Sequence, residues 1–163
     1  MTYHQWAQML DAALDSFSAE RLQKVVLSRV CEIRFEDNVD VDSALAFLNN
    51  NYPNCTRFVF EPRAHHAFFG ASPETLAGLK GRRLSTMGLA GSAPRGQSVE
   101  EDAGFGQELL DSAKDQHEHK VVVDAIRRRL APICAELEMP NEPDLLKLSN
   151  IQHPVSYTHL RAH

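Results

Sequence analysis

The sequence predicts an α+β fold in which helices flank a mainly antiparallel sheet. Helical patterns near the N-terminus precede several short runs rich in β-branched residues, and a long helical region follows these runs. No strand-loop-helix unit carries the glycine-rich loop that binds dinucleotides or nucleoside triphosphates. The sequence therefore gives no support to a nucleotide-binding fold.

The composition indicates one globular domain or a piece of a larger one. The 163 residues are 43% hydrophobic and 24% charged, and the formal net charge of −5 provides no overall basic field for nucleic acid or anionic lipid. No apolar run approaches the roughly 20 residues that span a bilayer, and the N-terminus lacks a secretory signal pattern. We expect a cytoplasmic chain that binds neither nucleic acid nor membrane. Cys31, Cys55 and Cys134 are far apart and odd in number, which favours reduced, buried thiols.

The first 50 residues predict a helix, a strand and a second helix. Apolar side chains recur at helical spacing over residues 3–18, which predicts an amphipathic helix packed on a core. The segment 24–35, KVVLSRVCEIRF, is rich in β-branched residues and predicts a long strand. Asp40 or Asp42 can cap the second helix, which is expected to run to about Asn50.

A strand meander and a glycine-rich loop follow. We expect strands over residues 56–61, 67–70, 75–79 and 83–89, the last two joined by a tight turn at Lys80 and Gly81. The stretch GLAGSAPRG, residues 88–96, is then a loop. Ser98 starts a capping box with Glu101, and the helical region should run to about Glu138, with a kink or break at Pro132. Residues 140–143 predict a turn, and 145–151 the start of another strand.

The last residues have a separate origin in our interpretation. Residues 155–163, VSYTHLRAH, match the in-frame translation of a transposase adapter used in DNA library preparation, and Pro154 would be a hybrid codon. We therefore expect native sequence to end at His153, residues 154–163 to be a non-native tail, and the natural protein to continue differently. The tail is excluded from the fold prediction.

Four clusters of residues could carry chemistry: Lys24 in KVVLSR, Glu74 in GASPE, the loop around Gly91, and KDQHEH at residues 114–119. Each has a plain structural alternative. A lysine at a strand end is usually solvated, a glutamate after proline can sit in a turn, loop glycines can serve only positive φ angles, and KDQHEH can be a solvated helix face.

A zinc site at His117, Glu118 and His119 is disfavoured, because neighbouring helix positions point about 100° apart. Glu118 alone, with hard oxygen ligands, better suits Mg²⁺ that bridges to an anionic substrate. His65 and His66 could form a metal patch, but an exposed hairpin between strands is the favoured interpretation.

Taken together, these motifs resemble the chorismate-utilising enzymes and, within them, the isochorismate synthases. The resemblance rests on KVVLSR at 24–29, FFGASPE at 68–74, LAGSAPRG at 89–96 and ELLDSAKDQHEH at 108–119, in the family's order, and it covers residues 3–153. It implies that residues 1–153 are an incomplete, N-terminal part of a chorismate-binding domain. A full-length member is expected to be a monomer that takes chorismate and Mg²⁺.

The resemblance also implies roles for individual residues. Lys24 would be the base for an attacking water and Glu74 the acid for the departing hydroxyl, while Gly91 and Ser92 would touch substrate and Glu118 would bind Mg²⁺. A free lysine has a pKa near 10.4 and a free glutamate near 4.3, so both roles need a site that lowers the first and raises the second. The family's other magnesium carboxylate, its substrate-binding arginine and a further lysine lie beyond position 153, so this chain alone is expected to be inactive.

Several alternatives stay open. The related anthranilate and aminodeoxychorismate synthases use ammonia and usually have glutamine where Lys24 stands, so this lysine favours water as the nucleophile. Salicylate synthases share the lysine and go on to eliminate pyruvate. Menaquinone and siderophore pathways need the same isochorismate, and the motifs look somewhat more like the menaquinone type. A noncatalytic binding module remains a hypothesis from another class.

Overall fold

The computed structural model describes residues 1–162, and side chains through residue 161. The chain divides into two compact units, residues 1–39 and 40–163, and each is described by itself. In the first unit, α1 (Tyr3–Ser18) has the predicted bounds. Thr2 begins it with a capping box, because its hydroxyl accepts from the Gln5 N–H at 3.2 Å and the Gln5 side chain accepts from the Thr2 N–H at 2.8 Å. No residue of α1 is buried, so the expected packing of its apolar face on a core is not observed within this unit.

The predicted strand over residues 24–35 is wrong for this structure. The segment is extended coil without a strand assignment, and Val26, Val30 and Ile33 are 79%, 83% and 70% exposed. β-Branched residues suit a pleated surface, but a strand also needs a neighbouring backbone to satisfy its N–H and C=O groups. None of the described strands pairs with this segment.

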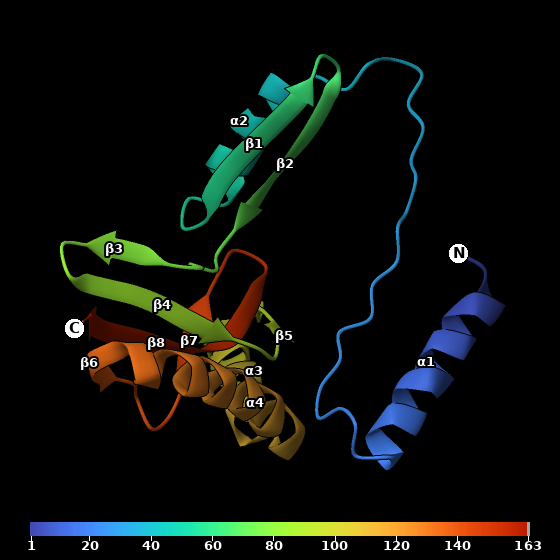
Figure 1. The fold of residues 1–163 in the computed structure, drawn as a ribbon. Helices are drawn as coiled ribbons and strands as arrows, with labels where there is room; N and C mark the ends of the chain where they lie inside the picture. The colour runs from blue at the N-terminus through green and yellow to red at the C-terminus, as the bar shows by residue number, and fades with distance from the viewer. Residues whose placement is uncertain (163) are drawn as a thin grey trace. The chain divides into compact units, whose positions relative to one another are not determined.

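The second unit begins with a helix and a hairpin. Asp40 caps α2 (Val41–Asn51), as one of the two expected caps, by accepting from the Asp42 N–H. β1 (Thr56–Arg63) and β2 (His66–Ser72) then form an antiparallel two-stranded sheet (Figure 1). The turn between them contains His65 in the left-handed region, at φ 63°, so the expected exposed hairpin at the histidine pair is confirmed.

A six-stranded antiparallel sheet forms the centre of this unit. Its strands are β3 (Gly78–Lys80), β4 (Arg83–Leu89), β5 (Ala93–Pro94), β6 (Cys134–Glu138), β7 (Asp144–Lys147) and β8 (Ile151–Ala162). β8 is the longest and pairs with β4, β5, β6 and β7 along its length (Figure 1). β3 and β4 turn at Gly81 and Arg82, one residue later than expected, because Lys80 pairs with Arg83.

Most of β8 comes from the segment that we interpret as a tail. Ser156, Thr158 and Leu160 alternate with exposed residues and are 3%, 0% and 6% exposed. Tyr, Thr and Val fit a half-buried pleated surface, so the segment has strand character whatever its origin. The adapter origin of residues 154–163 stays a prediction.

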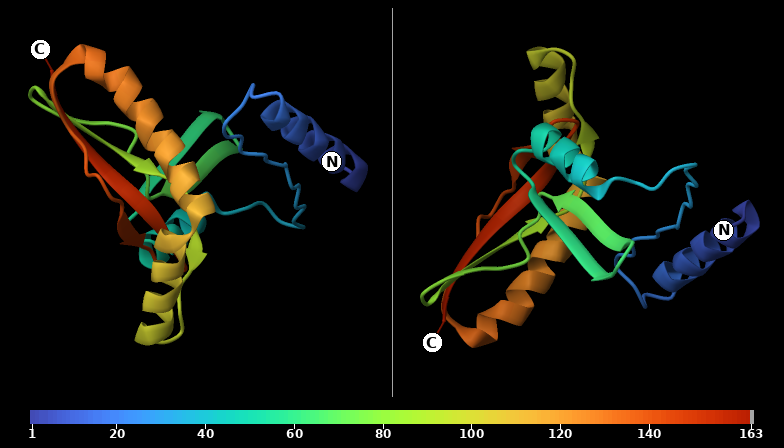
Figure 2. Two further views of the ribbon diagram at one scale, coloured as in Figure 1. Left: turned by 90° about the horizontal axis from the view of Figure 1, so that it is seen from below. Right: turned by 90° about the horizontal axis from the view of Figure 1, so that it is seen from above.

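Two helices pack against the sheet where one long helical region was expected. α3 (Val99–Asp111) and α4 (Ala113–Leu130) are separated at Ser112, which caps α4, and α4 lies along the sheet (Figure 2). The expected extension to Glu138 is wrong: Pro132 lies in a single 3₁₀ turn, η1 (Ala131–Ile133), after which β6 begins. Gly88 on β4 allows close approach, since a Cβ there would lie 3.3 Å from Val123 of α4.

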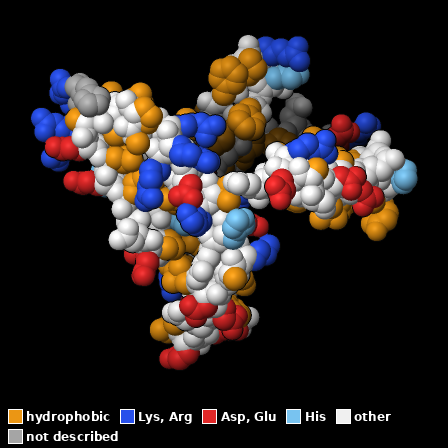
Figure 3. All heavy atoms as spheres, turned by 60° about the horizontal axis from the view of Figure 1, so that its bottom comes forward, with side chains coloured by type: hydrophobic (Ala, Val, Ile, Leu, Met, Phe, Trp, Pro, Cys, Tyr) orange, Lys and Arg blue, Asp and Glu red, His pale blue; other side chains and the backbone are white. Residues whose placement is uncertain are grey.

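The molecule is α+β with antiparallel sheets, as predicted. The cysteine prediction holds in part: all three thiols are free, Cys55 and Cys134 are buried, and Cys31 is exposed. Large hydrophobic side chains lie at the surface (Figure 3), among them Phe60 and Phe68 of the hairpin at 65% and 68% exposure. Within residues 1–162, no helix is both long and apolar enough to cross a membrane.

Two glycines of α3 test how tightly this helix packs on the sheet. A Cβ at Gly106 would meet Leu145 at 2.7 Å and the Gln152 amide oxygen at 2.9 Å, whereas a Cβ at Gly104 meets nothing within 4 Å. Gly104→Ala should raise the free energy of unfolding by up to about 1 kcal/mol through helix propensity. The free energy of unfolding of Gly106→Ala should be about 1–3 kcal/mol lower than that of Gly104→Ala, because the added methyl group overpacks the contact with the sheet. Urea unfolding followed by circular dichroism compares them, and equal values would contradict the packing of α3.

Candidate functional site

The glycine-rich loop is a short bridge between two strands. It leaves β4 at Leu89, which pairs with Val155 of β8, and enters β5 at Ala93, which pairs with Gln152 of the same strand. Gly91 lies between them with φ +89°, a conformation that L side chains rarely adopt. The ends of the loop are therefore fixed on β8 while its middle, Gly91 and Ser92, is only partly covered or exposed.

His153 holds the middle of this loop. Its Nδ1 lies 2.9 Å from the Gly91 carbonyl oxygen and 3.0 Å from the Ser92 hydroxyl oxygen. A carbonyl only accepts, so Nδ1 carries the proton and donates to Gly91. Sequence reasoning gave His153 no site role. His153 ends the run KLSNIQH, residues 147–153, and only the pairing of β5 with β8 brings it to the loop.

The loop lies against the start of α4. Ser112 caps this helix by accepting from the Asp115 N–H at 3.3 Å, and a Cβ built at Gly91 would lie 3.3 Å from the Asp115 carboxylate. Glu118 is three positions further along α4, and residues at this spacing are neighbours on one helix face. The predicted substrate loop therefore approaches the start of α4, and Glu118 follows about one turn further along the same helix.

The Glu118 carboxylate has the right chemistry for a hard cation. Its side chain is 34% exposed, and Lys114 lies 3.8 Å away as an i,i+4 ion pair. Among residues 1–162, no three His, Cys, Asp or Glu side chains are grouped so as to hold a metal ion. One carboxylate oxygen donor fits Mg²⁺, which keeps several waters and often binds through one or two carboxylates plus substrate oxygens.

The other two predicted residues are Glu74 and Lys24. Glu74 follows β2 with an exposed side chain, and its N–H donates to the Ser72 hydroxyl at 3.3 Å. The connection continues to Leu76, whose carbonyl accepts from Thr86 of β4. Lys24 is half-buried in the first unit, residues 1–39, so its place with respect to the loop stays a prediction.

A cavity of about 620 Å³ lies alongside the first turns of α4. Asp115 and His119 line it together with α3 and the turn at residues 140–143. His119 is 5% exposed, and its Nε2 lies 2.9 Å from the Ser156 hydroxyl. Of the cluster KDQHEH, one histidine is therefore part of the packing between α4 and β8, whereas its neighbour Glu118 is 34% exposed.

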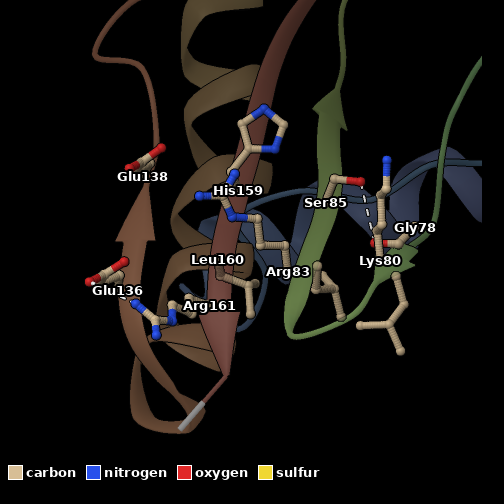
Figure 4. A pocket seen from close by; sticks show the side chains of 11 residues that line it. Gly78, Lys80, Arg83, Ser85, Glu136, Glu138, His159, Leu160 and Arg161 are labelled. Atoms are coloured by element: carbon tan, nitrogen blue, oxygen red, sulfur yellow. Dashed lines mark hydrogen bonds and ion pairs between the residues drawn. The ribbon is translucent and has the colours of Figure 1, made fainter.

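A second cavity, of about 550 Å³, lies at the far end of the sheet (Figure 4). It is lined by charged and polar side chains from three parts of the sheet: Glu136 and Glu138 of β6, Lys80 and Arg83 of the β3–β4 hairpin, and His159 of β8. It contains none of the residues that the motifs single out, and part of its wall belongs to the segment interpreted as a tail. We assign it no role.

A family model described as chorismate binding enzyme matches residues 1–163. The chain belongs to the chorismate-binding enzyme family. Two relatives illustrate the match. The chain is 38% identical over 149 residues to the salicylate biosynthesis isochorismate synthase of Pseudomonas aeruginosa, covering 91% of this chain and 31% of the relative. It is 36% identical over 138 residues to isochorismate synthase DhbC of Bacillus subtilis, covering 81% and 35%.

Solved structures of the family share this fold. The chain matches a putative 2,3-dihydroxybenzoate-specific isochorismate synthase, DhbC, from Bacillus anthracis with a TM-score of 0.73 and 31% identity, covering 78% of this chain and 35% of that one. It matches MenF, the menaquinone-specific isochorismate synthase from Escherichia coli, with a TM-score of 0.71 and 26% identity, covering 77% and 29%. The chain thus spans about a third of the length of these chorismate-binding enzymes.

Alanine substitutions at Gly91 and Gly81 distinguish the effect of close packing of the loop from the effect of backbone strain. Both have positive φ, but a Cβ at Gly81 meets nothing within 4 Å, whereas one at Gly91 would contact Asp115 and Pro154 at 3.3 Å. Gly81→Ala should cost about 1 kcal/mol of unfolding free energy through strain alone. Gly91→Ala should cost about 1–3 kcal/mol more, because the Asp115 side chain has to move away from the added methyl group. Equal losses in thermal or urea unfolding would show that the loop does not press on α4.

Proposed function

We propose that this chain is part of an isochorismate synthase, which converts chorismate to isochorismate with Mg²⁺. The observation that carries the proposal is Lys24 in KVVLSR, at the position where the ammonia-using relatives usually have glutamine. The relatives' names support it, since the similar proteins from Pseudomonas aeruginosa and Bacillus subtilis are isochorismate synthases. Ammonia is a nucleophile without a base, whereas water near neutral pH needs one.

The reaction requires a base and an acid at different ring carbons. Neutral Lys24 takes a proton from water while the water oxygen bonds to one ring carbon of chorismate. The ring double bonds shift at the same time. Protonated Glu74 gives its proton to the hydroxyl that leaves from the other carbon, so that water is lost as water is gained. Each residue ends in the opposite protonation state, and proton exchange with solvent restores both.

The loop and α4 supply the substrate-binding part of the proposal. Chorismate carries two carboxylates, and the backbone at Gly91 and Ser92 can approach such a group closely because neither side chain is large. Glu118 would hold Mg²⁺, which supplies positive charge to a substrate carboxylate. His153 keeps the loop in place by its bond to the Gly91 carbonyl.

The test is to express the complete source gene, incubate the protein with chorismate and Mg²⁺, and identify products by chromatography and mass. Isochorismate alone supports the water-adding synthase. Salicylate with pyruvate would move the protein to the salicylate synthases, which share the lysine. No product from a folded protein would contradict the proposal and favour a noncatalytic binding module.

Lys24→Gln and Glu74→Gln in the complete protein should each lower kcat by about 10²–10⁴-fold, because each removes one half of the acid–base pair. Lys80→Gln is the matched control, since Lys80 is an exposed lysine of the β3–β4 hairpin. Steady-state rates of isochorismate formation provide the measurement. A variant within a few-fold of the parent would remove that residue from its role.

Glu118→Ala should shift the Mg²⁺ concentration for half-maximal activity upward by about 10-fold or more, because a charged first ligand is lost. Glu108→Ala removes an exposed carboxylate of α3 and should leave the titration unchanged. Activity is followed as Mg²⁺ is added to metal-free protein. An unchanged curve for Glu118→Ala would take this residue out of the ligand set.

A further inference from the structure

Asp102 in α3 is a nearly buried carboxylate held by two cations. It is 8% exposed, and the Arg95 guanidinium reaches both its oxygens, with Nε to Oδ1 at 2.5 Å and Nη2 to Oδ2 at 3.0 Å. Lys147 of β7 donates to Oδ2 at 2.7 Å. Bidentate Arg–carboxylate pairs are strong and fix geometry, so this is a directional contact rather than a loose surface pair.

The same carboxylate also holds the backbone at the end of the glycine-rich loop. The Gly96 N–H donates to Oδ1 at 3.1 Å, and a Cβ on Gly96 would overlap the Asp102 backbone nitrogen. The Arg95 guanidinium donates in addition to the Leu148 carbonyl. The residues PRG at 94–96, which close LAGSAPRG, are thereby tied to the first turn of α3 and to the end of β7.

Gln152 of β8 connects this cluster to the sheet. Its side-chain amide is fully buried and donates to the carbonyls of Pro94 and Asp102, at 3.0 and 3.2 Å. On the other side of the loop, His153 Nδ1 donates to the Gly91 carbonyl at 2.9 Å. Gly91 and Ser92 therefore lie between this contact and the end fixed by Asp102.

We propose that Asp102 is a positioning residue for substrate binding, because its contacts with Arg95, Gly96 and Lys147 hold the downstream end of the loop that carries Gly91 and Ser92. The inference rests on the proposed function only for the identity of the substrate. Asp102 touches no reacting group. It acts through the loop, so its loss weakens substrate binding more than it slows the chemical step.

Asp102 stays ionised, and therefore keeps its two cationic partners, over the ordinary pH range. Hydrogen bonds from Arg95 and then Lys147 lower the pKa of Asp102 far below its ordinary value of 3.8, against the opposing effect of burial. Its contribution to stability is present above the ordinary value and is lost only as the pH falls through the lowered pKa. At neutral pH the carboxylate stays ionised, so ordinary pH changes do not break its contacts with Arg95 and Lys147.

The experiment compares Asp102→Asn with Glu108→Gln in the complete protein. Asparagine keeps the shape but removes the charge, and Glu108 is an exposed carboxylate of the same helix. Hydrogen exchange, measured by mass spectrometry, should become at least about tenfold faster in peptides covering residues 89–97 of Asp102→Asn, with the centre of α4 unchanged. KM for chorismate should rise by about tenfold or more while kcat changes less than about threefold. The Glu108→Gln protein should match the parent in both.

If Asp102→Asn does not fold, Lys147→Met removes one of the two cations and should give a smaller change in the same direction. Unchanged loop exchange, or faster exchange spread evenly over residues 40–153 with KM unchanged, would overturn the proposal in favour of a merely structural ion pair. An equal fall in kcat with KM unchanged would overturn it as well. If the parent has no activity on chorismate, the proposed function fails, and the exchange measurement still decides whether Asp102 holds the loop.

Discussion

The carboxylate of Asp102 is the contact on which the arrangement of the second unit depends. A buried carboxylate is unfavourable unless it is paired and hydrogen-bonded, and here Arg95, Lys147 and the Gly96 N–H satisfy it. Because these partners come from the glycine-rich loop and from β7, satisfying one charge fixes three segments at once. The fully buried Gln152 extends the same constraint to β8.

This constraint fixes the shape of the glycine-rich loop. The Asp102 cluster and the pairing of β5 with β8 hold its downstream end, and His153 holds the carbonyl at Gly91. The loop can then present backbone groups beside the first turns of α4, where Asp115 contacts it and Glu118 lies one turn further on. A rigid frame with a small-residue centre is what close approach to an anionic substrate requires.

Local signals in the sequence predicted local structure well. α1, the cap at Asp40 and the histidine turn followed from spacing, capping and turn chemistry, which act over a few residues. The strand at 24–35 failed because strand pairing is decided by a distant partner. The helix to Glu138 failed because the chain forms β6 after the break at Pro132. β8 was missed for the most part because residues 154–163 were set aside.

The motifs supplied the candidate site residues, whose roles stay predictions, but not the side chains that hold the loop. Gly91, Ser92 and Glu118 were identified from motifs, and the structure brings the loop and α4 together. The sequence did not indicate a role for Asp102, His153 or Gln152. Their role depends on partners that folding brings close from up to 62 residues away in the chain.

The most direct test of the central claim, that the held loop and the start of α4 form the substrate-binding surface, is a crystal structure of the complete protein with chorismate and Mg²⁺. We expect a substrate carboxylate within hydrogen-bond distance of the backbone at Gly91 or Ser92, and Mg²⁺ bound to an oxygen of Glu118. Chorismate bound away from residues 89–96, with Glu118 facing solvent and without metal, would contradict the account.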